Sequence, residues 1–153
     1  MMKELIVRFL ALLDKQPPAD DALLEKLAHT LDALTHAMSE LPQGRRALDA
    51  PDPPDLDHVA SRQKICLLFP DLGFYPSVDP LTDLSKAMPE VGIEDAIDDI
   101  VDIASDLTKA EWRFSNVDDL DACWNLHFFY RVHWGRHLLN LRGLLHARLH
   151  ERS

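Results

Sequence analysis

Two histidines one helical turn apart are the first residues in this sequence that could carry chemistry. His133 and His137 enclose Trp134-Gly135-Arg136, so they are spaced i and i+4. On a helix this spacing lets two imidazole nitrogens approach one ion at about 2.0–2.1 Å, as zinc requires. The motif lacks the glutamate of H-E-x-x-H proteases, and two ligands do not complete a site. Any further ligand must come from another segment.

An aspartate-rich stretch lies upstream of the two histidines. Asp95, Asp99, Asp102 and Asp106 recur at helical spacing. Magnesium-dependent helical nucleotide hydrolases arrange carboxylates in this way, but they use acidic pairs on two facing helices. Here only one predicted helix carries the pattern, and its acids oppose the apolar face. Because a charged stripe opposite an apolar stripe normally faces water, we expect this surface to be solvated.

Polar side chains also fall on the predicted packing stripe of the last helix, over residues 117–150. Projected at about 100° per residue, this stripe is centred on Trp134 and includes His127, Tyr130, Arg131 and His137. A buried cation is costly unless it is paired, so we expect at least one contact with an aspartate of another helix. Two interpretations are open. The residues form a structural network, or they line a pocket for a small anion or a metal ion, with the candidate ligand-binding residues His127, Tyr130, Arg131 and Trp134.

The elements that must position these residues are helices. Leucine and methionine recur every three or four residues over 24–41, and residues 93–108 have one apolar and one acidic face. A short helix is predicted from Asp79-Pro80 to about Met88, and no stretch alternates with a period of two. The prediction is an all-α, single-domain antiparallel bundle over 1–153, with about five or six helices, a long C-terminal helix and an acidic, proline-rich loop at 43–57.

Composition narrows the class of protein. The 153 residues have a net charge of −10, which argues against direct nucleic-acid binding. The charge is uneven, because residues 122–153 contain five arginines and one acid, a net of +4. No apolar run is long enough to span a membrane, and two cysteines are too few for a disulfide framework. We therefore expect a cytoplasmic protein.

The C-terminal half resembles a known family. The run from Asp98 to Leu107, a tryptophan-containing link, and the segment from Phe129 to His137 with H-W-G-x-H are similar to a bacterial domain of unknown function, the one numbered five thousand and sixty-three. The resemblance covers about residues 65–149 and implies a small cytoplasmic helical protein without an established activity. This chain has Ala104-Ser105 where relatives tend to have an aromatic and a basic residue. The resemblance directs attention to Asp102, Asp106, His133, Trp134 and His137.

Two hypotheses about function follow. The first is a non-enzymatic interaction module, because no complete catalytic constellation is present and the acidic body suits a protein partner with a basic surface. The second is a metal- or anion-dependent hydrolase or ligand-binding protein that uses the two C-terminal motifs. Its divalent metal would be held by Asp102, Asp106, His133 and His137, and Arg131 or Arg136 would hold an anionic substrate.

Overall fold

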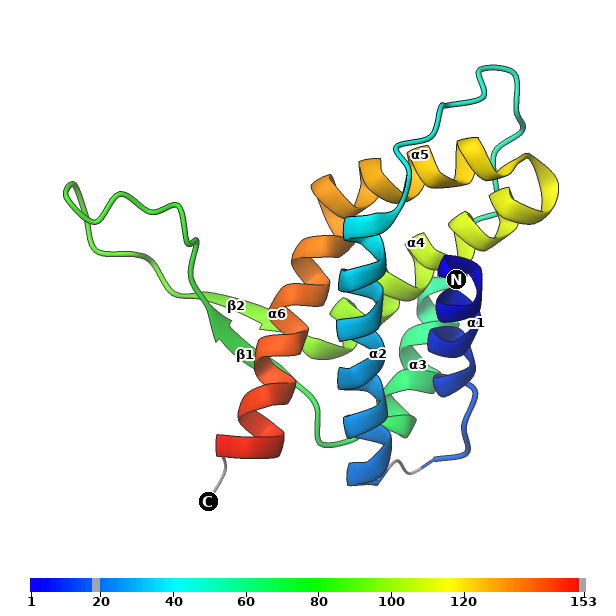
Figure 1. The fold of residues 1–153 in the computed structure, drawn as a ribbon. Helices are drawn as coiled ribbons and strands as arrows, with labels where there is room; N and C mark the ends of the chain where they lie inside the picture. Colours follow the sequence, from blue (N-terminus) through cyan, green and yellow to red (C-terminus); the bar gives the residue numbers. More distant parts are fainter. Residues whose placement is uncertain (18–19, 152–153) are drawn as a thin grey trace.

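Helices make up most of the chain. The computed structural model describes residues 1–17 and 20–151. Its α-helices are α1 (Met2–Leu12), α2 (Asp21–Glu40), α3 (His58–Leu68), α4 (Ala96–Asn116), α5 (Asp119–Phe129) and α6 (Gly135–His146). The predicted all-α bundle is therefore confirmed (Figure 1). No helix in this described part is both long and apolar enough to cross a membrane.

Aspartate side chains define where four of these helices begin. Asp20, Asp57, Asp95 and Asp118 precede α2, α3, α4 and α5, and each carboxylate accepts a hydrogen bond of 2.8–3.0 Å from a first-turn backbone N–H. Such a cap satisfies one of the amides that a helix leaves without a partner, and it stabilises the helix by about 1 kcal/mol. These caps account for four of the 19 aspartates of the chain.

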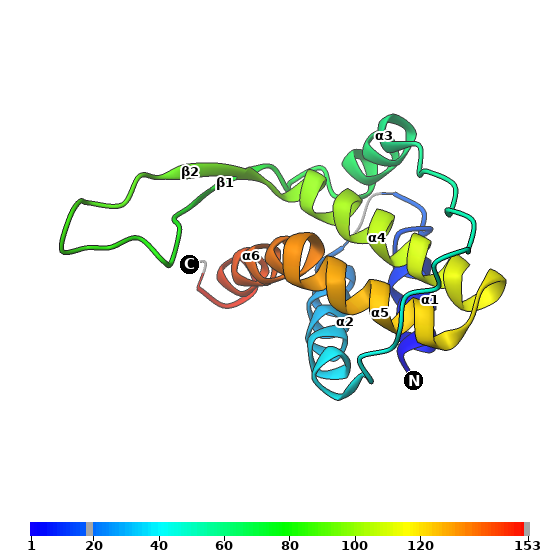
Figure 2. The same ribbon diagram turned by 90° about the horizontal axis from the view of Figure 1, so that it is seen from above.

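Helix α4 lies at the centre of the bundle and contacts α1, α3, α5 and α6 (Figure 2). Its apolar face is fully buried at Ile100, Ile103 and Leu107. Complete burial of each such side chain contributes about 1.5–3 kcal/mol to folding. Trp134 and Leu138, from the C-terminal helical segment, pack into the same core. The helix predicted over 93–108 is present, and it extends further, to Asn116.

The long C-terminal helix is present but bent. Between α5 and α6, residues Tyr130–Trp134 form a π-helical turn, in which the amide of Gly135 donates to the carbonyl of Tyr130. A Cβ atom at Gly135 would lie 2.3 Å from that carbonyl oxygen, so only glycine fits there. Helices α5 and α6 consequently run in different directions (Figure 1). A second π-helical turn, Ala147–Glu151, ends the described chain.

The region before α4 differs from the prediction. Strands β1 (Phe74–Ser77) and β2 (Gly92–Asp95) pair antiparallel, with Tyr75 opposite Glu94, and residues 78–91 connect them without a helix. The predicted short helix from Asp79 is therefore wrong. The carboxylate of Asp79 does accept a hydrogen bond from a backbone amide two residues on, but this closes a turn. The strands have one buried residue between them, Tyr75, so they carry no alternation of apolar and polar residues.

The proline-rich segment 43–57 has no helix or strand, as expected for a loop. Its first part is attached to the start of α5. Gly44 adopts a left-handed conformation with φ of 74°, and the next amide, that of Arg45, donates to the carbonyl of Leu120 at 2.9 Å. The amide of Ala47 donates to the buried carboxylate of Asp121 at 2.8 Å. This loop therefore crosses the end of the bundle where α5 begins.

Candidate metal centre

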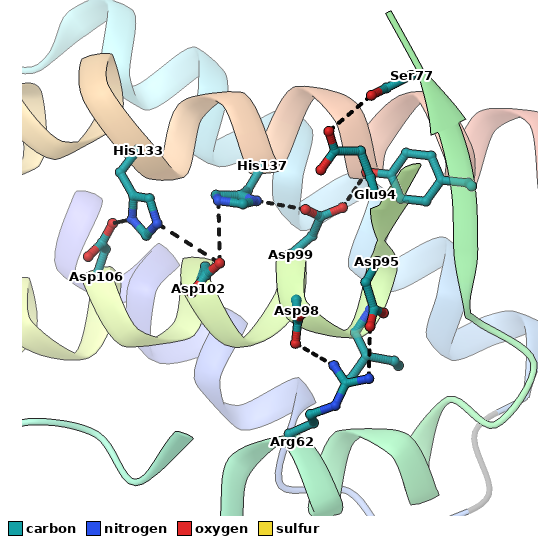
Figure 3. A network of polar contacts seen from close by, with 12 residues as sticks. Arg62, Ser77, Glu94, Asp95, Asp98, Asp99, Asp102, Asp106, His133 and His137 are labelled. Carbon is teal, nitrogen blue, oxygen red and sulfur yellow. Dashed lines mark hydrogen bonds and ion pairs between the residues drawn. The ribbon is translucent and has the colours of Figure 1, made fainter. Parts of the chain in front are cut away.

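Two facing helices bring the aspartates and the histidines of the sequence motifs together. Asp99, Asp102 and Asp106 lie at i, i+3 and i+7 on α4, on the side that faces the C-terminal helix. His133 belongs to the π-helical turn and His137 to α6, and their rings lie 4.9 Å apart in a T-shaped arrangement. Figure 3 shows both imidazoles directed toward the aspartate side chains.

Each imidazole is anchored through its Nδ1 atom by a different carboxylate. Nδ1 of His133 lies 2.6 Å from Oδ2 of Asp106, and Nδ1 of His137 lies 2.7 Å from Oδ1 of Asp99. An ionised carboxylate can only accept, so the hydrogen of each ring stands on Nδ1. In the neutral imidazole the lone pair is then on Nε2, which is the arrangement of a metal-binding histidine whose other nitrogen donates to a carboxylate.

The two Nε2 atoms converge on the carboxylate of Asp102. Its Oδ2 atom lies 3.3 Å from Nε2 of His137 and 3.9 Å from Nε2 of His133 (Figure 3). One ligand atom from each of the three residues falls within 4.8 Å of the others. Two ligands that bind one tetrahedral zinc ion at about 2.0–2.1 Å are themselves about 3.3 Å apart. The separation between Asp102 and His137 equals this value and that between Asp102 and His133 is longer, so the group is close to, but wider than, a site with three protein ligands.

The site is partly open to solvent on the ligand side and closed behind it. The side chains of Asp102, His133 and His137 are 27%, 40% and 24% exposed, whereas Asp99 is 1% exposed. The hydroxyl of Tyr75, a buried residue of β1, donates to the other oxygen of Asp99. Asp99 is thus fixed on both sides, and it fixes the ring of His137.

Ion pairs at the start of α4 hold the helix in its place. Arg62 of α3 binds Asp95 at 2.8 Å and also binds Asp98 (Figure 3). On the neighbouring strand, Ser77 donates to Glu94 at 3.0 Å. These contacts tie α3, the hairpin and the first turn of α4 together, so the aspartates further along α4 project from a supported helix.

Proton affinities in the cluster reflect these contacts. The hydrogen bond to Asp99 raises the pKa of His137 above its ordinary value of 6.5, against the effect of burial, and the negative charge of Asp102 adds to the increase. Burial raises the pKa of the Asp106 carboxyl, and the contact with His133 offsets part of this change. Burial and the contact with Asp99 raise the pKa of Tyr75, which keeps its hydroxyl protonated as a donor. These contacts therefore favour the protonated form of His137 beside the carboxylates.

The expected metal ligands and the observed cluster overlap, with one correction. Asp102, His133 and His137 come together as expected. Asp106 does not join them, because its carboxylate binds the Nδ1 side of His133, away from the point where the three ligand atoms converge. Its place is behind the ligand, where it orients the ring. Asp99, which orients His137 in the same way, was not among the predicted site residues.

The expectation that Asp95, Asp99, Asp102 and Asp106 form a solvated face is wrong. Asp99 is buried, and the side chains of the other three are 12%, 27% and 9% exposed. The acidic side of α4 is covered because α6 and the hairpin lie against it. Asp99, Asp102 and Asp106 are spaced so that they can face His133 and His137 on a second helix. This spacing is the sequence signal that could have identified Asp99.

The members of the predicted ligand-binding set, His127, Tyr130, Arg131 and Trp134, lie in different surroundings. His127 binds the carbonyl of Leu41 at 2.8 Å through Nε2, and Tyr130 packs edge-to-face on the buried Trp134. Both are partly buried, as expected, but Arg131 is exposed and the prediction that it points inward is wrong. The predicted contact between the C-terminal helix and an aspartate of another helix is confirmed, because His137 binds Asp99. The π-helical turn explains why Arg131 is exposed. In this wider turn each residue is rotated by less than the 100° used in the projection.

A cavity of about 310 Å³ adjoins the cluster on the side of Asp106. Trp134 lines it, and its indole N–H is buried without a hydrogen-bond partner among the described residues. Lys109 and Arg113 of α4 contribute positive charge to its wall, and Asp52 and Asp55 of the proline-rich loop contribute negative charge. Its volume is at the lower end of the range for small-molecule sites.

The fold and the histidine–aspartate cluster define a helical protein with a candidate metal centre. The family model of a domain of unknown function, DUF5063, matches residues 2–151, so the chain belongs to this family, as the H-W-G-x-H resemblance implied. Protein BF1032 from Bacteroides fragilis has a similar crystal structure, with a TM-score of 0.77 and 16% identity over 97% of this chain and 93% of that chain. This likeness shows a common fold. No curated protein sequence matches the chain.

Proposed function

We propose that this protein binds one divalent transition-metal ion through Asp102, His133 and His137. The observation that carries the proposal is the orientation of the two imidazoles. Both Nδ1 atoms donate to carboxylates, and both Nε2 atoms are directed to the carboxylate of Asp102. Two histidines and one carboxylate suit zinc and other first-row ions, and a hard ion such as magnesium favours sites with oxygen ligands alone.

The charge of the cluster also favours a cation. Asp99, Asp102 and Asp106 bring three carboxylates to two imidazoles, and Asp99 is fully buried. A buried carboxylate is costly unless it is compensated. A divalent ion bound to the imidazoles would place two positive charges beside these carboxylates.

Three protein ligands leave a coordination position for water, which is the arrangement of catalytic rather than structural zinc sites. A bound divalent ion lowers the pKa of such a water toward about 7 and supplies a nucleophile for hydrolysis. Asp102, His133 and His137 are 27%, 40% and 24% exposed, so a small substrate can reach such a water from the solvent side of the cluster. We propose metal-dependent hydrolysis as the chemistry of this centre.

Calorimetric titration of the EDTA-treated, untagged protein with Zn²⁺ tests the proposal, together with elemental analysis of the reloaded protein. We expect close to one equivalent, and a loss of affinity of at least about 100-fold in Asp102→Asn and in His133→Asn. His146→Asn is the matched control, because His146 lies on the same helix but outside the cluster. Less than about a tenth of an equivalent of any transition metal after reloading would exclude the site.

Hydrolysis is tested separately with the zinc-loaded protein and a chromogenic phosphodiester and ester. We expect turnover that is lost in Asp102→Asn, while His146→Asn keeps the rate of the unmodified protein. If the protein binds zinc but turns over no substrate of such a panel, the proposed hydrolase activity is wrong and only the proposed metal binding stands.

Binding of a protein partner with a basic surface is a second candidate function, and one feature favours it. The segment Phe74–Asp95, called the arm below, projects from the bundle as β1, β2 and their connection (Figures 1 and 2). It carries five acidic side chains and one lysine. Acidic surfaces attract basic partners and speed their association. Co-purification at low salt and at about 0.5 M salt, where screening is strong, tests this function.

A further inference from the structure

The arm exposes more large apolar side chains than any other segment described. They are Phe74, Val78, Leu81, Leu84, Met88, Val91 and Ile93, with exposed fractions from 48% to 88%. Phe74 and Ile93 stand on the same face of the hairpin, opposite the face of Tyr75 that contacts the bundle. Exposed apolar side chains gathered on one segment in this way are typical of an interaction site.

Little within one chain supports the outer part of the arm. The base is held by the contact of Tyr75 with Asp99 and by the hydrogen bond from the amide of Ala96 to the carbonyl of Gly73. Over 78–91 the described hydrogen bonds are local, at Asp79 and Asp83. An isolated two-stranded hairpin is marginally stable in water, so an extended arm requires a surface to pack on.

The C-terminal helix offers a surface of complementary chemistry. Val132 and Leu139 are 58% and 56% exposed, and they form one outward stripe with Arg136 and Gly143. Arg131 and Arg136 have no carboxylate within ion-pair distance among the described residues. The added Cβ of a residue at position 143 would meet nothing within 4 Å, so the surface is open there. We call this stripe, with Arg131, the helix face.

Charge decides how two copies could combine. Two arms in contact would bring together ten acidic side chains and two lysines, whereas an arm on a helix face pairs acids with unpaired arginines. Like charges across an interface are unfavourable, and opposite charges fix the register. The apolar residues of both surfaces would be buried together in the second arrangement only.

We propose that the protein forms a two-fold dimer in which the arm of each copy lies on the helix face of the other. The proposal rests on the second candidate function and names its partner, a second copy of this chain. A two-fold axis uses the same contact twice, so both arms and both helix faces are covered. Figures 1 and 2 both show the arm leaving the bundle on the side where α6 ends.

The dimer connects the arm to the metal centre. Tyr75 at the base of the arm donates to Asp99, and Asp99 orients His137. An arm held by a second copy would therefore fix the position of Tyr75. The residues that contact the second copy are themselves separate from the three metal ligands, so the dimer and the metal site can be tested independently.

Sedimentation equilibrium of the full chain at about 1–100 µM is the test, since interfaces of ordinary size dissociate in this range or below it. One variant reverses charges on the arm (Asp79→Lys with Glu90→Lys), and the other reverses them on the helix face (Arg131→Glu with Arg136→Glu). We expect a dimer for the unmodified protein and monomers for each variant alone, because like charges then meet in both contacts.

Mixing the two variants provides the decisive measurement. In the mixed dimer the lysine arm meets the glutamate face, and the unmodified acidic arm meets the arginine face, so we expect dimers to return. A chain that is monomeric throughout the range, or an arm variant that dimerises as well as the unmodified protein, would overturn the proposal. Each variant should still bind close to one equivalent of Zn²⁺, because all three candidate ligands are kept, and this stoichiometry separates failure of the dimer from failure of the metal site.

Discussion

Asp99 and His137 form a hydrogen bond of 2.7 Å between a fully buried carboxylate and a half-buried imidazole. The bond joins α4 to α6 across the centre of the bundle. It fixes which nitrogen of His137 is directed to Asp102, and it raises the pKa of His137. A single contact thus sets the orientation, the tautomer and the proton affinity of one candidate metal ligand.

Replacing Asp99 by asparagine should weaken zinc binding without removing a ligand. The amide has no charge and accepts through one oxygen only. It therefore cannot accept hydrogen bonds from both Tyr75 and His137 as the carboxylate does. Carboxylates behind a metal-binding histidine typically account for 10–100-fold in affinity, and we expect a loss of about this size. Calorimetric zinc titration measures it. The control is Asp98→Asn, on the exposed side of α4, and equal losses in both variants would contradict the role of Asp99.

The metal-free protein should show a pH dependence that depends on His137. Its pKa is raised on folding, so the protonated form is stabilised in the folded state and contributes fully below about 6.5. The contribution is lost as the pH rises through the folded-state pKa. In EDTA, the difference in the free energy of unfolding between the unmodified protein and His137→Asn should therefore decrease from pH 6 upward, as measured by urea denaturation. A difference that grew with pH would contradict this sign.

The stabilisation of the protein by bound zinc should have the opposite pH dependence. The ion must displace the proton from His137, so its affinity should fall as the pH is lowered toward and below the raised pKa. Thermal unfolding with and without saturating Zn²⁺ measures the effect as a stabilisation that is larger at pH 8 than at pH 6. In Asp102→Asn the zinc-dependent stabilisation should be small at both values. A stabilisation of equal size at both pH values would show that zinc does not compete with this proton.

Much of the helical bundle could be predicted because its signals are local. The leucine spacing over 24–41 and the proline after it locate α2, and the H-W-G-x-H motif locates the two histidines on one helix. The hairpin could not be predicted, since each strand has four residues and its apolar side chains face solvent. The orientation of Arg131 could not be predicted either, because the π-helical turn breaks the regular rotation on which the projection rests.

Asp99 shows a different limit of prediction from the sequence. On α4 alone it belongs to the acidic face, which a single amphipathic helix would direct to water. Its burial comes from Tyr75 and His137, which are separated from it by 24 and 38 residues. Contacts of this range depend on how the elements pack. The sequence therefore pointed to the three candidate ligands but not to the carboxylate behind one of them.

Tyr75→Phe should destabilise the fold and affect the metal site indirectly. The change removes one donor from the buried carboxylate of Asp99 and leaves the ring in place, at a cost of about 1–3 kcal/mol. Urea denaturation measures the cost. Tyr130→Phe is the matched control, because the Tyr130 hydroxyl makes no side-chain hydrogen bond among the described residues, and we expect it to be close to neutral. Similar losses in the two variants would show that ring packing, and not the bond to Asp99, is responsible.

Gly135→Ala should be strongly destabilising although alanine favours helices. The new Cβ would lie 2.3 Å from the carbonyl oxygen of Tyr130, so the π-helical turn must rearrange. We expect a loss of about 1–3 kcal/mol, against a gain of about 1 kcal/mol from helix propensity. Gly143→Ala is the control on the same helix. Its Cβ meets nothing within 4 Å, so this variant should be more stable than the unmodified protein, when measured at protein concentrations low enough to keep the chain monomeric.

Gly135→Ala should also lower zinc affinity, because the turn sets the position of His133 relative to His137. An unchanged affinity would show that the turn does not position the two candidate ligands.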